Sequence, residues 1–177
     1  MPEPPQPHIH RLHDPPHIDK NVPWAFFDGA AQQQGCGGGF ILYISEQHYY
    51  KVKMGLGIGS NNFAKLISLR HLMHFSLNHN CMVIRIYGDS KIIVDWFNNI
   101  TTCHTRTLID ILDDVHNMKV LCKHIYREYN SSADELSKAA TSLPRGEWLI
   151  QEQRGTNAFQ YYHRPYIDPH YHRVESP

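Results

Sequence analysis

The sequence lacks several features that mark large classes of protein. No apolar run approaches the roughly 18 residues of a membrane-spanning helix, so we expect no membrane association. The first twenty residues contain no apolar stretch of the secretory kind, which favours an intracellular protein of the cytoplasm or nucleus. With 17 basic and 17 acidic residues, the chain has no charge surplus for binding nucleic acid, although a local basic patch is compatible with this balance.

Cysteine is also scarce, and no CxxC pair is present. The spacing of the cysteines argues against a zinc site and favours buried thiols in a reducing compartment. The residues concerned are Cys36, Cys81, Cys103 and Cys122.

The two ends of the 177-residue chain differ in composition from the middle. Residues 1–20 are rich in proline and histidine, so we expect a disordered tail. Histidines in this tail could hold a metal ion or simply be solvated, because nothing fixes a ligand geometry: His8, His10, His13 and His17. Residues 146–177 are expected to form an extended arm or a loose tail, with three candidate contact residues, Tyr161, Tyr162 and Tyr166. The remaining residues, 21–145, can form one domain with its own core, which we expect to be a monomer.

The middle of the chain alternates between strand patterns and helix patterns. Bulky and β-branched runs predict strands over residues 24–27, 39–47, 49–57, 81–88 and 123–129. Helical spacing and capping residues predict helices over residues 61–78, 89–99, 104–121 and 130–141. The stretch "QQQGCGGG" predicts a flexible turn. This order predicts an α/β fold, in which a five-stranded mixed sheet begins as an antiparallel meander, continues with parallel strands, and carries helices packed on it.

The helix expected over residues 61–78 has one unusual position. An apolar stripe predicts the face that packs on the core, formed by Leu66, Leu69, Met73 and Leu77. Lys65 lies along the edge of this stripe, near the start of the helix. Its ammonium should therefore emerge close to whatever the start of the helix faces.

Three aspartates occupy positions from which they can meet. Asp28 follows the first strand, Asp89 follows the fourth, and Asp134 lies in the first turn of the last helix. Each has an ordinary alternative, as a turn residue, a helix cap or an acid near a helix dipole. Together they predict a carboxylate cluster at the carboxyl ends of parallel strands, with oxygen ligands suited to Mg²⁺ or Mn²⁺.

Four stretches in this order carry a family resemblance: "FFDGAA", "GSNNFAKLISL", "IYGDSKIIVDW" and "HIYREYNSSADELSKAA". Between about residue 23 and residue 141, the sequence resembles ribonuclease H type 1, in the short form found in plant retrotransposons and related plant genes. The resemblance implies an RNase H-like fold, two Mg²⁺ ions and endonucleolytic cleavage of RNA paired to DNA. It assigns the acidic set to Asp28, position 65, Asp89 and Asp134, and where the family has glutamate at position 65 this chain has Lys65.

The resemblance also implies contacts with the substrate. Asn61 and Asn62 match an asparagine pair that contacts the minor groove of the hybrid, and helix capping is their structural alternative. His124 or Arg127 matches a residue near the leaving group, with an ordinary exposed strand position as the alternative. Lys91 could meet phosphates, although a solvated exterior explains it equally well.

Lys65 changes what the resemblance implies for catalysis. At an effective dielectric of about 20, an ammonium about 5 Å from a divalent ion repels it by several kcal/mol. Lys65 could instead pair with Asp28 or Asp89 as a counter-ion, or contact a phosphate. Three functions follow: a hybrid nuclease with impaired hydrolysis, a non-catalytic module that binds hybrids or other nucleic acid, and a protein-interaction scaffold. We expect an RNase H-like domain whose metal binding and cleavage are weak or absent.

Overall fold

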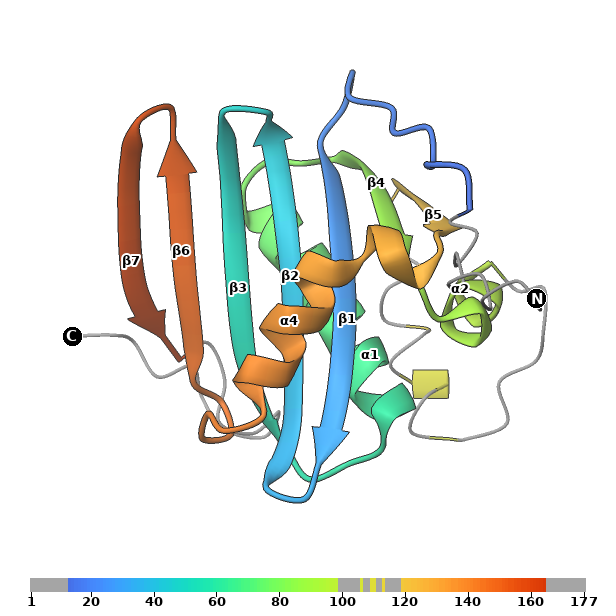
Figure 1. Ribbon diagram of the computed structural model, residues 1–177, viewed down its shortest axis with the longest axis vertical. Coiled ribbons are helices and arrows are strands. Elements are labelled where there is room, and N and C mark those ends of the chain that lie inside the picture. The colour runs from blue at the N-terminus through green and yellow to red at the C-terminus, as the bar shows by residue number, and fades with distance from the viewer. Residues whose placement is uncertain (1–12, 99–105, 107–108, 111–112, 114–118, 165–177) are drawn as a thin grey trace, which may run out of the picture.

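One mixed sheet organises the described residues, which are 13–98, 106, 109–110, 113 and 119–164 of this computed structural model (Figure 1). Its strands are β1 (Trp24–Gln32), β2 (Gly35–Ser45), β3 (His48–Gly57), β4 (Val83–Gly88), β5 (Lys119–His124), β6 (Trp148–Arg154) and β7 (Asn157–His163). Its helices are α1 (Asn61–Asn78), α2 (Lys91–Phe97), the short 3-10 helix η1 (Arg127–Tyr129) and α4 (Ser131–Ala140).

The strands follow the spatial order β5-β4-β1-β2-β3-β6-β7. β1 pairs in parallel with β4, and β4 with β5, whereas all other neighbours are antiparallel. This topology confirms the predicted α/β class, with an antiparallel meander followed by parallel strands. The predicted number of five strands was wrong, because β6 and β7 add a hairpin beside β3.

The hairpin comes from the segment that composition suggested was an arm or a tail. Buried and exposed side chains alternate along β6, so Trp148, Ile150 and Glu152 face inward. Gly155, with a φ of 56°, supplies the left-handed conformation that its two-residue turn requires. Tyr161 and Tyr162 lie in β7, whereas Tyr166 is outside the described residues.

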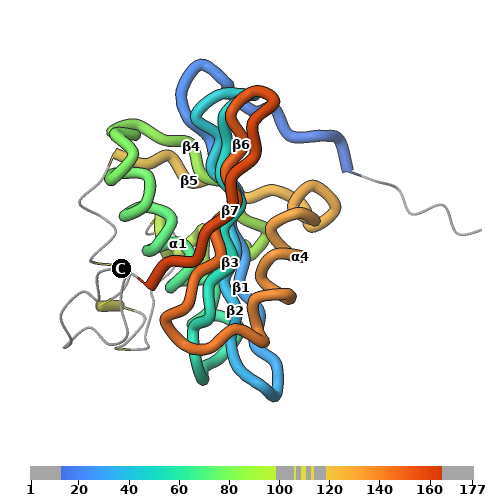
Figure 2. Tube along the Cα trace, turned by 90° about the vertical axis from the view of Figure 1, so that its left-hand side faces the viewer, coloured from blue at the N-terminus to red at the C-terminus, as the bar shows by residue number. Residues whose placement is uncertain are grey.

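Two helices cover opposite faces of the sheet. Figure 2 views the sheet from its β7 edge, with α1 on one side and α4 on the other. The larger core lies on the α1 side and includes Leu66, Leu69, Leu72, Met73, Phe27, Phe40 and Val52. The predicted stripe is therefore correct for three of its four members, while Leu77 is 43% exposed where α1 ends.

Only Gln33 and Gln34 of the stretch "QQQGCGGG" form the predicted turn, and its glycines belong to β2. A Cβ atom at Gly37 would lie 2.2 Å from the Ser137 carbonyl oxygen, and one at Gly39 would lie 2.7 Å from Leu136 Cβ. Glycine is therefore required in β2 because α4 packs directly on its backbone. Close helix packing overrides the low strand propensity of glycine here.

Two further boundaries differ from the sequence expectation. β5 begins at Lys119, and the residues expected to complete the last strand form η1. Most of the helix expected over residues 104–121 lies outside the described residues, as does Cys103. None of the described helices is both long and apolar enough to cross a membrane.

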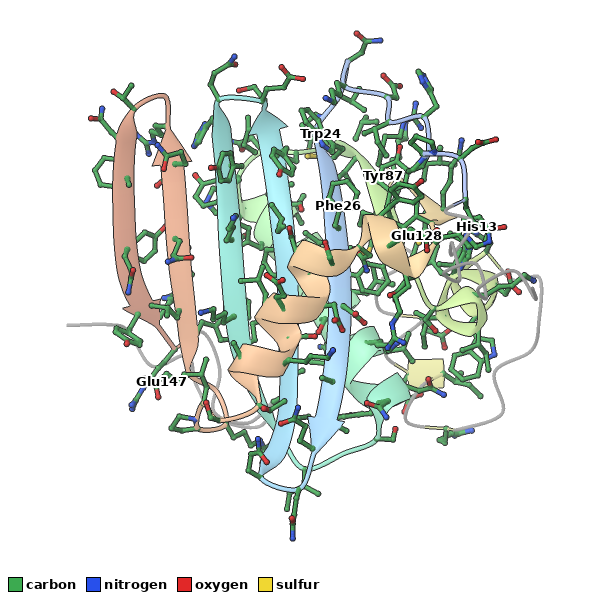
Figure 3. All side chains as sticks on the ribbon, in the orientation of Figure 1. His13, Trp24, Phe26, Tyr87, Glu128 and Glu147 are labelled. Atoms are coloured by element: carbon green, nitrogen blue, oxygen red, sulfur yellow. The ribbon has the colours of Figure 1, made fainter. Side chains whose placement is uncertain are left out.

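Residues 13–20, which the sequence placed in a tail, contact the domain. His13 lies beside Glu128 (Figure 3), with Nδ1 2.7 Å from Glu128 Oε1, and its ring stacks on Tyr126. Asp19 pairs with Arg85 of β4 at 3.6 Å. His8 and His10 lie outside the described residues. A second small core on this side contains Trp24, Tyr87 and Ile125, with Phe26 packed against it.

Candidate functional site

Asp28 lies on β1 at the point where β4, its parallel neighbour, ends. The register pairs Phe27 with Gly88, so the next residue of each strand is an aspartate, Asp28 or Asp89. Asp28 is 4% exposed, and its Oδ1 accepts a hydrogen bond from the Gly29 amide at 2.8 Å. The sheet topology thus places these two aspartates side by side, as the order of elements predicted.

Lys65 of α1 joins the same cluster. Its Nζ lies 3.5 Å from Asp28 Oδ1 and 4.0 Å from Asp89 Oδ1, and its side chain is only 21% exposed. These distances describe an ion pair with two carboxylates, one of the alternatives that the sequence left open for this residue. Lys65 therefore places one positive charge between two carboxylates and offsets part of their mutual repulsion.

Gly29 explains how Lys65 reaches the sheet. A Cβ atom at Gly29 would lie 2.4 Å from both the Ala64 carbonyl carbon and the Lys65 amide nitrogen. The absence of a side chain lets the first turns of α1 rest on the backbone of β1. The sequence suggested only a turn for "DGA", so this packing role of glycine was missed.

Asp28 is the member of the cluster whose pKa is strongly shifted. Burial, followed by the neighbouring Asp89 and then Asp134, raises the pKa of Asp28 from 3.8 to about 6. The ammonium of Lys65 and the Gly29 amide act in the opposite direction and hold this pKa down. Burial is thus the main cause of the raised pKa, and repulsion from the neighbouring carboxylates adds to it despite the lysine.

Asp134 approaches the cluster from α4 but has its own partner. Its Oδ2 lies 2.9 Å from Lys138 Nζ, one turn along the same helix. Its charge still raises the pKa of Asp28, which places it within electrostatic reach of the site. Asp134 is thus within electrostatic reach of Asp28 while its own ion pair is with Lys138.

Asn130 fixes the start of α4 and was not identified from the sequence. It is 2% exposed, and its Nδ2 donates to the Phe27 carbonyl oxygen at 3.0 Å. Its Oδ1 is buried and lacks a hydrogen-bond partner among the described residues. This amide links β1 to α4 next to Asp28, and the "YNSS" stretch signalled only a helix cap.

The predicted nucleic-acid residues occupy the ends of two helices. Ser60 caps α1 by accepting from the Phe63 amide at 3.1 Å, so neither Asn61 nor Asn62 has the capping role considered for them. Asn61 instead accepts from the Ala31 amide at 2.8 Å and remains exposed. Lys91 begins α2 and pairs with Asp95 at 3.1 Å, one turn along.

Of the two candidates for a role near the leaving group, His124 contacts the backbone of Asp89, and Arg127 lies further along the chain. His124 ends β5, and its Nε2 is 3.2 Å from the carbonyl oxygen of Asp89. Arg127 is exposed at the start of η1. The structure therefore brings His124 to the site through the backbone of Asp89, while Arg127 lies three residues further along.

The donor set does not match that of a divalent-metal site. Within the part of the chain that the structure describes, no three His, Cys, Asp or Glu side chains are grouped to hold a metal ion. The positions that metal ions would share with Asp28 and Asp89 lie close to the Lys65 ammonium. The arrangement suits an internal cation better than a pair of divalent ions.

Comparison with known families gives one match that spans more than half of the chain. Residues 26–140 match the model of a family described as reverse transcriptase-like. No curated protein matches the chain by sequence.

Solved structures share the fold at low sequence identity. RNase H1 of Halobacterium salinarum superposes with a TM-score of 0.63 at 19% identity, covering 67% of this chain and 96% of its own. LC11-RNase H1, isolated from compost by a metagenomic approach, gives 0.60 at 20% identity, with coverages of 68% and 96%. The N-terminal RNase H domain of a Mycobacterium tuberculosis protein gives 0.60 at 17% identity, with coverages of 68% and 93%. LC11-RNase H1 has also been solved in complex with an RNA/DNA hybrid. These similarities show that the chain has an RNase H fold.

Proposed function

The chain belongs to the reverse transcriptase-like family, and from this premise we propose that it binds RNA–DNA hybrids and hydrolyses them weakly or not at all. The observation that supports this most is the position of Lys65, within 4.0 Å of both Asp28 and Asp89. Binding and cleavage are separable properties of such a domain, because groove and phosphate contacts lie outside the carboxylate cluster.

Metal binding at the carboxylates is expected to be weak. In two-metal nucleases, the ions activate the attacking water and stabilise the leaving oxygen. At an effective dielectric of about 20, an ammonium about 4 Å from a divalent ion repels it by roughly 8 kcal/mol. Outward rotation of Lys65 on its flexible stem would relieve this repulsion without supplying the missing carboxylate.

Hybrid binding relies on residues that the ion pair leaves free. Asn61 uses its carbonyl oxygen within the protein, so its amide group remains available to donate to a groove or a 2′-hydroxyl. Asn62 lies on the next position of the same exposed helix end. Lys91 is available to phosphates if its pairing with Asp95 is exchanged for a contact with the ligand.

We also propose that the domain acts inside the cell, in the cytoplasm or the nucleus. The described cysteines, Cys36, Cys81 and Cys122, are all buried free thiols. Burial raises the pKa of Cys122 to about 12, which keeps this thiol protonated and unreactive. Such thiols suit a reducing compartment.

The binding arm of the test compares one labelled RNA–DNA hybrid with DNA duplex of the same sequence across a salt titration. We expect a preference for the hybrid and a steep loss of affinity with salt. Asn62→Ala should reduce the preference, whereas Asn78→Ala, at the opposite end of α1, should not. Equal affinity for both duplexes would overturn hybrid recognition and leave only nonspecific charge binding, whereas no binding to either would favour a protein-interaction scaffold.

The cleavage arm isolates Lys65. With Mg²⁺ or Mn²⁺, the unmodified protein should cut the hybrid little, and Lys65→Glu should raise cleavage at least about a hundredfold, a few kcal/mol in barrier. Lys53→Glu, which makes the same charge change on β3, is the matched control and should leave cleavage unchanged. Adding Asp89→Asn to Lys65→Glu should remove the gain and exclude a contaminating nuclease.

Two outcomes would contradict the impaired site. Strong cleavage by the unmodified protein that Asp28→Asn removes would mean that three carboxylates suffice. No gain from Lys65→Glu in a folded protein would mean that the rest of the site cannot support hydrolysis either.

A further inference from the structure

The outer edge of the sheet at β7 is unusual for a free protein surface. Among the described residues, no strand pairs with the side of β7 that faces away from β6. β6 packs against α1, since the Trp148 ring lies 5.0 Å from the His71 ring, but neither α1 nor α4 lies over β7 (Figure 1). β7 therefore presents an unpaired row of backbone donors and acceptors.

The side chains of β7 give this edge little protection against pairing. Its sequence, NAFQYYH, contains no lysine, arginine, acid or proline, the residues that usually prevent edge strands from associating. Three large side chains are exposed, at 48% for Phe159, 42% for Tyr161 and 61% for Tyr162. Exposed aromatics on an uncharged edge favour association with another strand.

We infer that β7 is the dimerisation edge of this protein, pairing antiparallel with β7 of a second copy about a two-fold axis at Gln160. The two sheets then form one continuous sheet across the axis. This inference does not depend on the proposed hybrid binding, because the carboxylate cluster lies on β1 and β4, on the other side of β2, β3 and β6.

The register follows from the hairpin. Arg154 and Asn157 close its two-residue turn as a hydrogen-bonded pair. Along an antiparallel strand, successive residues direct their backbone N–H and C=O groups alternately toward one neighbouring strand and toward the other. Counting from Asn157, every second residue of β7 therefore directs these groups away from β6. The outward backbone groups belong to Ala158, Gln160 and Tyr162. Centring the axis on Gln160 pairs all three with outward residues of the second copy and overlaps the full length of both strands.

The side chains are self-complementary in this register. Phe159 of each copy lies opposite Tyr161 of the other, which forms a four-ring cluster on the face that carries Ile150. On the other face, Ala158 lies opposite Tyr162, so a small side chain meets a large one. Because β7 carries no charged side chain, bringing two copies together costs no like-charge repulsion. One strand per copy is a small interface, so the dimer should be reversible and dependent on concentration.

The first test measures the mass of the full chain in solution over a range of concentrations without nucleic acid, by sedimentation equilibrium. Gln160→Lys places two lysines across the axis and should raise the dimer dissociation constant at least tenfold. The matched control is Gln151→Lys, at the β6 position directly opposite Gln160 in the same hairpin. This control should change the dimer dissociation constant less than threefold. Mixing Gln160→Lys with Gln160→Glu should restore association.

The second test reads the register by disulfide formation in a Cys103→Ser background. Phe159→Cys mixed with Tyr161→Cys should cross-link readily, and each variant alone much less, because identical residues are offset across the axis. A monomer at every concentration would overturn the inference, as would a dimer unaffected by Gln160→Lys. Preferential cross-linking of each variant with itself would refute this register.

Discussion

Replacing Asp28 by asparagine should stabilise the protein at neutral and alkaline pH. The pKa of Asp28 is raised from 3.8 to about 6, because the carboxyl is buried and lies beside Asp89. A carboxyl with a raised pKa contributes stability that is complete below pH 3.8 and is lost as the pH rises through about 6. Ionisation of this group at pH 8 therefore lowers the free energy of unfolding.

The size of the effect follows from the pKa. The rise from 3.8 to about 6 corresponds to about 3 kcal/mol at a pH well above 6. Asparagine has nearly the same shape, carries no charge and can still accept from the Gly29 amide. We expect Asp28→Asn to be more stable than the parent by about 2–3 kcal/mol at pH 8, and the difference to vanish near pH 4.

Urea unfolding followed by tryptophan fluorescence measures this difference, since Trp24 and Trp148 are both buried. Asp19→Asn is the control, because the Asn21 amide and, to a smaller extent, Arg85 lower the pKa of the partly exposed Asp19, so its effect should be small and opposite in sign. Equal or lower stability of Asp28→Asn at pH 8, or a difference that does not change with pH, would refute the reasoning.

Three further changes test the site and its supports. Lys65→Met should raise the pKa of Asp28 further, so stability should fall more steeply between pH 6 and 8 in urea titrations, and this added slope should disappear in Asp28→Asn. Gly39→Ala should cost about 1–3 kcal/mol by thermal unfolding, because its Cβ would meet Leu136 of α4 at 2.7 Å; no loss would mean that α4 can shift freely. Ser60→Ala should cost about 1 kcal/mol in urea unfolding through the lost cap of α1, and an unchanged midpoint would contradict that role.

The sequence predicted those elements in which local signals and tertiary packing agree. The bounds of α1 were predicted correctly from its apolar stripe, although its cap is Ser60 and not Asn61 or Asn62. The parallel pairing of β1 with β4 followed from strand-helix-strand order, and it was enough to place Asp28 beside Asp89.

The prediction failed where a distant element decides the local structure. Nothing local shows that α4 will lie on β2, so glycines selected for that contact looked like a flexible turn. Likewise, the amide of Asn130 can be recognised as a link to β1 only once both ends of the contact are known. The β6–β7 hairpin was missed for a different reason, because its aromatic and histidine-rich composition outweighed its strand alternation and its glycine turn.

The two ends of the sheet lead to one view of how this domain could act. Toward one end, Lys65 pairs with two buried carboxylates, an arrangement that we propose opposes hydrolysis but leaves the exposed helix end at Asn61 open to a ligand. At the other end, the uncharged edge of β7 is the proposed site of pairing with a second copy. A dimer formed there would hold two of the proposed hybrid-binding surfaces in one continuous sheet, so a long hybrid could be held twice without any stronger single contact. Retention of a hybrid, rather than its turnover, is the property that both ends of the sheet would favour.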